Sequence, residues 1–263
     1  MKSTLDQIKD IKNHGYTLDF STVFNNAFEN YKKIALYAGL ILLVFSIVFG
    51  IIAYSILAAI YGIDKLSNPE FFNIQTQHLS QIKLVYYVVG TALFSAILSP
   101  FAAGFLKMAE CADKDEEFNV STIFTYYKTS HFFQIFIATL LISLFGGIIS
   151  TFLETQKLNN LGLLISLAIS YFTFLTIPLI VFGNLKAITA IQSSFIIISK
   201  QPFVLLGLMI TIIVALLVGF LALFIGILFT VPLSYSMTYA IYYAIFKNDK
   251  EDPIDSIGQS GLE

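Results

Sequence analysis

Hydroxyl side chains beside prolines are the groups in this chain best suited to form a polar site inside apolar helices. Three apolar segments contain a proline, and each proline has a hydroxyl residue within three positions. Proline lacks the backbone N–H, so a carbonyl one turn earlier loses its helical partner and can join a nearby hydroxyl. The predicted polar pocket or hinge comprises Pro100, Pro178, Pro232, Ser99, Thr176, Thr230 and Tyr235.

Other hydroxyl residues lie within the same apolar segments. We expect most of them to hydrogen-bond to their own backbone or to a neighbouring helix, and not to a substrate. They are Tyr54, Thr91, Ser95, Ser143, Ser166, Ser170, Tyr171, Thr173, Thr211, Ser234, Ser236 and Tyr239.

Metal and nucleophile chemistry has little support in the residue pattern. His14, His78 and His131 are far apart in the chain, and no two of them have the spacing of helical metal ligands. Cys111 is the only cysteine and stands among acidic residues, which disfavour a thiolate. Glu116 and Glu117 could meet His131, but a solvated acidic loop is the simpler interpretation. We therefore predict no cofactor, no bound metal and no catalytic residue.

The composition is that of a membrane protein. Of the 263 residues, 57% are hydrophobic and only 12% are charged, which is far from the balance of a soluble domain. The net charge is −2 and all fifteen basic residues are lysines, so the sequence gives no indication of nucleic-acid binding. The N-terminus lacks the apolar run of a cleaved signal, so the first spanning helix is expected to serve as its own insertion signal.

Runs of apolar residues predict an all-α polytopic membrane helical bundle with about six spans. A span needs about 20 apolar residues, and the uncharged run from Gln201 to Phe246 is long enough for two. None of the six spans contains Asp, Glu, Lys or His, which argues against a proton-coupled transporter, a redox pump or a charged channel filter. The spans are about 34–63, 84–106, 132–153, 161–183, 202–222 and 226–246, within a membrane domain of residues 34–246.

Amphipathic segments precede the spans. Residues 1–33 predict two surface helices, of which the second, from Asp19 to Lys33, carries a stripe of aromatic residues. These stripes fit either the headgroup boundary or the protein's own spanning helices. A further segment lies at Asn184 to Lys200, and the polar residues 247–263 are predicted to be a disordered cytoplasmic tail.

The chain shows an internal repeat of a surface helix followed by a hairpin with proline in its second helix. Ser21 to Phe24 and Ser121 to Phe124 are alike in sequence, and Pro100, Pro178 and Pro232 fall at comparable depths. Each unit crosses twice, so the three copies would be parallel repeats. The interruption at Thr176-Ile-Pro178 is the expected break in the fourth span.

Lysine counts predict the orientation in the membrane. With a cytoplasmic N-terminus, twelve lysines lie on that side and only Lys65, Lys83 and Lys157 lie on the other. Both termini are therefore expected in the cytoplasm. The absence of arginine and the richness in Phe, Ile, Lys, Asn and Tyr indicate a bacterial inner-membrane protein.

The last third of the chain resembles the membrane domain attached to some bacterial glycerophosphodiester phosphodiesterases, and related bacterial six-span families. The residues that carry the resemblance are Thr176-Ile-Pro178, Ala190, Ser194, Gly207, Gly219, Gly226, Val231-Pro232, Tyr239, Tyr242 and Tyr243. Members of that family often have an acidic residue where Thr189 stands here. The family's domain accompanies a catalytic domain that these residues do not contain, so the resemblance implies no phosphodiesterase activity.

We expect a non-enzymatic protein that organises lipid or supports a membrane-protein partner, with membrane lipid as its main contact. A carrier or flippase for a lipid or another apolar molecule is the alternative. A membrane enzyme is the third possibility, and a carotenoid-oxygenase type is disfavoured because three scattered histidines do not surround an iron.

Overall fold

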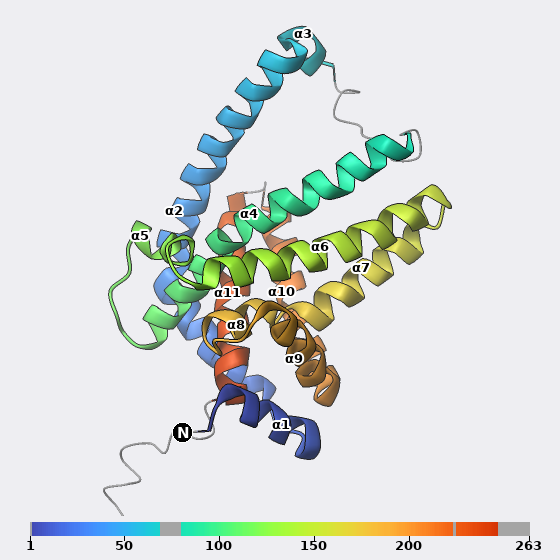
Figure 1. Cartoon of the computed structure of the whole chain (residues 1–263). Helices are drawn as coiled ribbons and strands as arrows, with labels where there is room; N and C mark the ends of the chain where they lie inside the picture. Colours follow the sequence, from blue (N-terminus) through green and yellow to red (C-terminus); the bar gives the residue numbers. More distant parts are fainter. Residues whose placement is uncertain (1, 69–79, 223–224, 247–263) are drawn as a thin grey trace, which may run out of the picture.

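The computed structural model describes residues 2–68, 80–222 and 225–246, and in these residues helices are the only regular secondary structure (Figure 1). The predicted tail 247–263 and His78 lie outside the described residues. The helices in chain order are α1 (Thr4–His14), α2 (Phe20–Tyr61), α3 (Ile63–Leu66), α4 (Gln81–Asp113), α5 (Val120–Ile123), η3 (Thr125–Tyr127), α6 (His131–Thr155), α7 (Asn159–Thr173), α8 (Thr176–Val181), α9 (Ala187–Lys200), α10 (Pro202–Leu221) and α11 (Ile225–Phe246).

Five helical segments in the described part of the chain are long and apolar enough to cross a membrane. They are Phe20–Tyr61, Gln81–Asp113, His131–Thr155, Asn159–Val181 and Pro202–Leu221, and they coincide with the first five predicted spans. The sixth predicted span is helix α11, which has 22 residues and is not among the five. The predicted all-α membrane bundle is therefore the observed fold.

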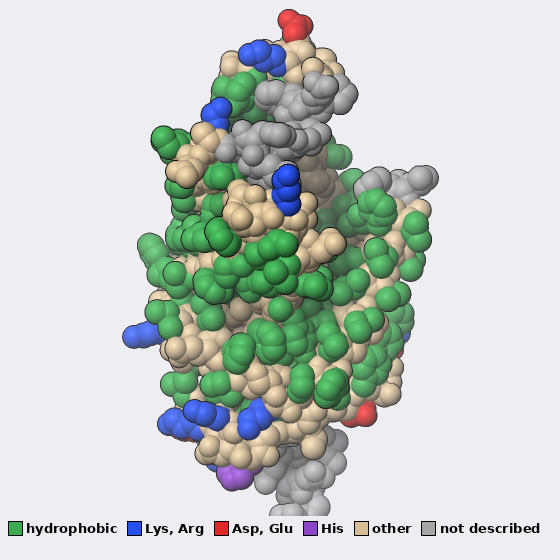
Figure 2. Space-filling view, turned by 90° about the vertical axis from the view of Figure 1, so that its right-hand side faces the viewer, with side chains coloured by type: hydrophobic (Ala, Val, Ile, Leu, Met, Phe, Trp, Pro, Cys, Tyr) green, Lys and Arg blue, Asp and Glu red, His purple; other side chains and the backbone are tan. Residues whose placement is uncertain are grey.

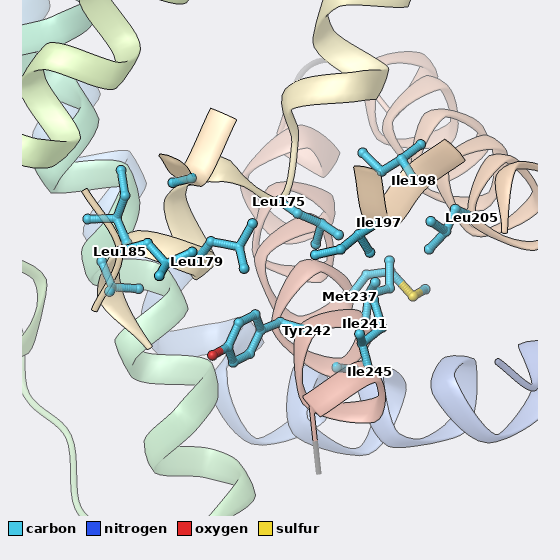
Figure 3. Packing of buried hydrophobic residues seen from close by; sticks show 14 of the residues in the cluster. Leu175, Leu179, Leu185, Ile197, Ile198, Leu205, Met237, Ile241, Tyr242 and Ile245 are labelled. Carbon is cyan, nitrogen blue, oxygen red and sulfur yellow. The ribbon is translucent and has the colours of Figure 1, made fainter. Parts of the chain in front are cut away.

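The buried core lies at one end of the molecule, which we call the base. The base comprises α1, residues 20–41 of α2, residues 99–113 of α4, α5, η3, α8, α9, residues 202–212 of α10 and residues 232–246 of α11. Its packing is dense: Leu179, Ile197 and Ile241 are all fully buried, and side chains of α9 and α11, among them Ile197 and Met237, come together at its centre (Figure 3). Away from the base, residues 43–61 of α2 diverge from the other helices (Figure 1).

Helices α4, α6 and α7 form a second region, which we call the layer. α4 packs along α6, and α6 packs along α7. Buried positions outside the base are few in the layer: Val88, Ala92 and Ala96 of α4, Ile135, Ala138 and Thr151 of α6, and Gly162 of α7. The rest of the layer presents apolar side chains outward, and Figure 2 shows an apolar band between the charged ends of the molecule. Such a band is suited to lipid tails.

The predicted surface helix at Asp19 to Lys33 is not a separate element. It is the first part of α2, which continues through Ile34 for 42 residues until Gly62, where φ is 85°. Asp19 caps its start by accepting a hydrogen bond from the Thr22 N–H at 2.7 Å, and hydrogen bonds from Thr22 hold the pKa of that carboxyl below its usual value. No glycine or proline stands between the two predicted segments, so nothing in the backbone interrupts the helix.

The three lead-in segments of the predicted repeat also differ from one another. The first belongs to α2, and the second is the short turn α5 followed by η3, held by the Asn119 cap. The third is the separate helix α9, divided from α10 by Gln201. Residues 21–23 and 121–123 both open a helix, after the caps Asp19 and Asn119, but the first helix continues into the span whereas the second ends at Ile123.

The predicted interruption of the fourth span is confirmed. Helix α7 ends at Thr173 and α8 begins at Thr176, with Pro178 as its third residue. Proline cannot donate to the carbonyl of Phe174 and its ring displaces that carbonyl, so the helix breaks just before it. Ser194 of α9 donates a hydrogen bond at 2.8 Å to the carbonyl of Phe172, beside the break.

Helices α10 and α11 form the predicted hairpin. A Cβ on Gly219 would lie 2.9 Å from the carbonyl carbon of Gly226, so the two glycines allow the helices to meet closely. Helix α11 then packs along α2, where the Ser236 hydroxyl donates to the carbonyl of Ala27 at 2.6 Å.

Candidate functional site

The proline-adjacent residues lie in three separate helices, α4, α8 and α11. Ser99, Pro100, Thr176, Pro178 and Pro232 are buried, each within its own helix packing. The Ser99 hydroxyl donates to the carbonyl of Ala96 at 2.8 Å, as expected for a helical serine. None of the seven predicted residues lines any of the four cavities described below.

The remaining members of that set contact apolar neighbours. The ring of Tyr235 stacks on Phe105 of α4, with ring centres 5.1 Å apart. The Thr230 hydroxyl points back to the carbonyl of Ile227 at 3.4 Å. Thr176 is 1% exposed, and its hydroxyl has no hydrogen-bond partner among the described residues. The prolines thus lie where helices pack together. Beside Pro178, the hydroxyl of Thr176 has no partner among the described residues.

A different set of hydroxyls meets in the layer. A cavity of about 280 Å³ is lined by hydroxyls from all three helices of the layer, which are Thr91 and Ser95 of α4, Ser143 of α6, and Ser166 and Ser170 of α7. Its other lining residues are Ala92, Ile142, Gly146, Gly147 and Ile169. These residues lie near the middle of the predicted spans. We call this space the hydroxyl cavity.

Two glycines of α6, Gly146 and Gly147, line the hydroxyl cavity. A Cβ on Gly147 would lie 3.3 Å from Cγ1 of Val88, and one on Gly146 would lie 3.8 Å from Cδ1 of Ile169. A side chain at Gly147 would therefore meet α4, and one at Gly146 would meet α7. Because both positions are glycine, α6 presents no side chain there and the space beside it stays open.

The hydroxyls in this cavity differ from other hydroxyls in the spans. Ser55, Thr211 and Thr238 each donate to a carbonyl four residues earlier, at 2.8 to 3.0 Å. In the cavity only Thr91 does so, donating to the carbonyl of Tyr87 at 2.8 Å.

Four cavity hydroxyls are available to a ligand. Within the described part of the chain, Ser95, Ser143, Ser166 and Ser170 have no hydrogen-bond partner. A polar group without a partner costs free energy in hydrocarbon, so a bound molecule that pairs with these hydroxyls would be stabilised.

Apolar grooves adjoin the hydroxyl cavity. One of about 560 Å³ lies between α6, α7 and α9, and its walls include Ile142 and Ile169, which also line the hydroxyl cavity. Another of about 320 Å³ runs between the outer parts of α4 and α6, from Leu84 to Thr155. Polar and apolar binding surfaces therefore stand side by side in the layer.

The base carries a polar groove of about 670 Å³ between α1, the end of α9 and the end of α11. Lys2, Asp10, His14, Tyr16 and Lys200 are among its lining residues. The Lys2 ammonium pairs with Asp10 at 2.9 Å, and the Tyr16 hydroxyl donates to the carbonyl of Ile197. Burial raises the pKa of the Tyr16 phenol, so this group stays neutral.

The acidic segment after the second span is partly structural. Asp113 accepts hydrogen bonds from the Asn30 amide at 3.1 Å and from the Tyr239 hydroxyl at 3.0 Å. It thereby ties α2, α4 and α11 together. Lys33 donates to the carbonyl of Ala112 and pairs with Asp115. Glu116 and Glu117, which were predicted to form a solvated loop, are exposed and follow this segment.

No group of three metal-ligating side chains occurs among residues 2–68, 80–222 and 225–246. The ring of His131 is engaged by Asn184 at 2.9 Å and packs edge-on against Tyr126. Cys111 is buried. Comparison with known proteins adds no assignment, because no family model, curated protein or solved structure matches this chain.

The sequence contains a signal for the hydroxyl cavity that the proline pattern obscured. Thr91 and Ser95 are four residues apart, and so are Ser166 and Ser170, which places each pair on one helix face. Ser143 precedes Gly147 by the same interval. The spans of α4, α6 and α7 therefore each have one face with hydroxyl-bearing or small residues. Together these three faces can form a common polar site.

Proposed function

We propose that this protein binds a membrane lipid at the hydroxyl cavity and acts on it as a carrier, without enzymatic chemistry. The observation that carries the proposal is the set of unpaired hydroxyls at the middle of three apolar helices. Lipids are amphipathic, so a polar part would pair with Ser95, Ser143, Ser166 or Ser170 while its chains occupy apolar surface. The adjoining apolar grooves supply such surface.

Reconstitution in liposomes tests the carrier proposal. The measurement is transbilayer movement of a fluorescent lipid, followed by its accessibility to an added quencher. We expect the full chain to accelerate movement, and Ser143→Leu to reduce it strongly because the larger side chain fills the cavity. Ser55→Leu is the matched control, since Ser55 is an exposed α2 hydroxyl that lines none of the four cavities.

Two results would contradict the carrier proposal. One is a rate of lipid movement no higher than in protein-free liposomes. The other is an equal rate for the full chain and for Ser143→Leu.

Support of a membrane partner is a second candidate function, favoured by the outer half of α2. Residues 43–61 are largely exposed and apolar, and a Cβ on Gly50 would meet nothing within 4 Å. Ser46 and Gly50 are four residues apart, the spacing that lets another helix approach closely. With Cys111 replaced by serine, a Gly50→Cys variant oxidised in membranes tests this idea. A cross-linked product supports it, and monomer alone contradicts it.

We further propose that both termini face the cytoplasm of a bacterial inner membrane. The proposal is supported by lysine positions: Lys65 in α3, Lys83 in the first turn of α4 and Lys157 after α6 all belong to the ends farthest from the base (Figure 1). Labelling of a Lys157→Cys variant by an impermeant thiol reagent in intact cells is expected. Protection of that cysteine until the cells are opened would reverse the orientation.

The resemblance to the phosphodiesterase-associated membrane domain remains a prediction. The residues that suggested it have packing roles, such as Ser194 beside the α7–α8 break and Gly219 against Gly226. These contacts would support a helix arrangement shared with that family. They would not support a catalytic activity.

A further inference from the structure

We infer that the hydroxyl cavity accepts an uncharged, hydroxyl-bearing headgroup, such as glycerol or a sugar, and rejects a phosphate. The inference deepens the proposed carrier function and rests on it. It identifies the ligand as a neutral lipid of the diacylglycerol or glycosyl-diacylglycerol class.

The wall of the hydroxyl cavity carries no charge that could pair with a phosphate. No ionisable side chain lines the hydroxyl cavity. Along the helices, the nearest lysine on α4 is Lys83, about 12 Å of helix from Thr91, and Glu154 lies about 16 Å from Ser143. A charge held at this depth is expensive without an opposite charge beside it. A phosphate in the cavity would have no such partner.

The wall of the hydroxyl cavity offers both hydrogen-bond donors and hydrogen-bond acceptors. Each of the five hydroxyls is both a donor and an acceptor, so the cavity as a whole offers both. A carboxylate or phosphate only accepts and a quaternary amine does neither, so each would leave part of that capacity unused. A ligand hydroxyl also donates and accepts, which makes a polyol the chemical complement of this wall.

The hydroxyl cavity is small. Its volume of about 280 Å³ lies just below the range of ligand sites, which is about 300 to 1,000 Å³. One glycerol or one sugar ring suits such a space, whereas a headgroup together with two acyl chains does not. The chains would therefore remain outside, against exposed apolar side chains of the same helices such as Phe94 and Leu167.

Photo-crosslinking distinguishes these headgroups. The full chain is reconstituted in phosphatidylcholine vesicles that contain a photoactivatable diacylglycerol, glucosyl-diacylglycerol or phosphatidylglycerol with identical acyl chains. Cross-linked peptides are then mapped. We expect the two neutral lipids to label α4, α6 and α7 at the cavity at least about tenfold more than phosphatidylglycerol, as one or two extra hydrogen bonds imply.

Variants sharpen the experiment. Ser143→Ala removes one hydrogen-bonding group and is expected to lower neutral-lipid labelling about 3- to 10-fold. Ser143→Thr keeps the hydroxyl and is expected to retain labelling, which separates lost bonding from a disturbed fold. Ser143→Lys supplies a cation, so its labelling should shift toward phosphatidylglycerol.

The possible results distinguish a failure of the headgroup inference from a failure of the lipid-carrier proposal. Equal labelling by phosphatidylglycerol would overturn the headgroup inference while leaving a lipid carrier intact. Labelling of the cavity by none of the probes, as expected if it holds only water, would overturn both. Unchanged neutral-lipid labelling in Ser143→Ala would show that the headgroup does not bond there.

Discussion

The base and the layer satisfy their polar groups in opposite ways. In the base, Asp113, Ser194 and Ser236 each bond to a group on another helix, and these bonds join distant parts of the chain. In the layer, four of the five cavity hydroxyls have no partner among the described residues. Polar groups therefore hold the base together, whereas the cavity hydroxyls of the layer are available to a ligand. Substitutions in the two regions should have correspondingly different effects.

The largest difference is expected from adding one methyl group. A Cβ at Gly104 would lie 2.6 Å from the carbonyl carbon of Ile123, where two backbones meet. We expect Gly104→Ala to destabilise the protein by about 3 kcal/mol, because neither backbone can move without breaking the base. The measurement is the unfolding midpoint in detergent. Gly90→Ala, in the layer, meets nothing within 4 Å and should stabilise by about 0.5–1 kcal/mol.

Equal midpoints for the two alanine variants would contradict the contrast between a packed base and an open layer. The contrast would also fail if Gly90→Ala lowered the stability as much as Gly104→Ala. Such a loss of stability would require a neighbouring atom that a Cβ at Gly90 does not meet.

The next effect is expected at the hydrogen-bonding centre of the base. Asp113→Ala leaves the Asn30 amide and the Tyr239 hydroxyl without their acceptor, and Asn30 is buried. Bonds to a charged group are the stronger kind, so we expect a loss of about 2–3 kcal/mol. Asp115→Ala is the control, because Asp115 is exposed and its pair with Lys33 should contribute less than about 1 kcal/mol. Unfolding in denaturant would measure both, and a greater loss for Asp115→Ala would contradict this assignment.

Local sequence patterns predicted the helices well because each span is specified by its own apolar residues. The α7–α8 break followed from Pro178 alone. Features that depend on distant partners were not accessible in this way. The sequence analysis predicted no role for Asp113, since its partners Asn30 and Tyr239 lie 83 and 126 residues away.

The same limit explains the surface helix and the candidate site. Residues 20–33 continue into the first span and pack on α11 through contacts such as Ala27 with Ser236, which no local pattern indicates. For the hydroxyl cavity, the four-residue spacing of Thr91 and Ser95 was visible. The missing information was that α4, α6 and α7 are neighbours, so the hydroxyls beside the prolines were preferred.

A smaller effect, of the opposite sign, is expected at Thr176. Its hydroxyl is buried in the base without a partner among the described residues, so it is an exception to the pairing found there. Thr176→Val keeps the shape and removes the polar atom, which should stabilise the protein by about 1 kcal/mol. Thermal unfolding in detergent would detect the shift. A destabilisation would mean that this hydroxyl has a partner, such as a buried water molecule.

The smallest change in stability is expected for Ser143→Ala, and it gives the sharpest comparison of the two regions. The Ser143 hydroxyl has no bond within the described protein to lose, so the unfolding free energy should change by less than about 0.5 kcal/mol. Ser194→Ala removes the same atom in the base but deprives the carbonyl of Phe172 of its hydroxyl donor, which should cost about 1–2 kcal/mol. If lipid labelling falls in Ser143→Ala and stability falls only in Ser194→Ala, the layer hydroxyl serves a ligand and the base hydroxyl serves the fold. A similar loss of stability in both variants would mean that the cavity hydroxyls are structural, and the distinction between the base and the layer would fail at its central point.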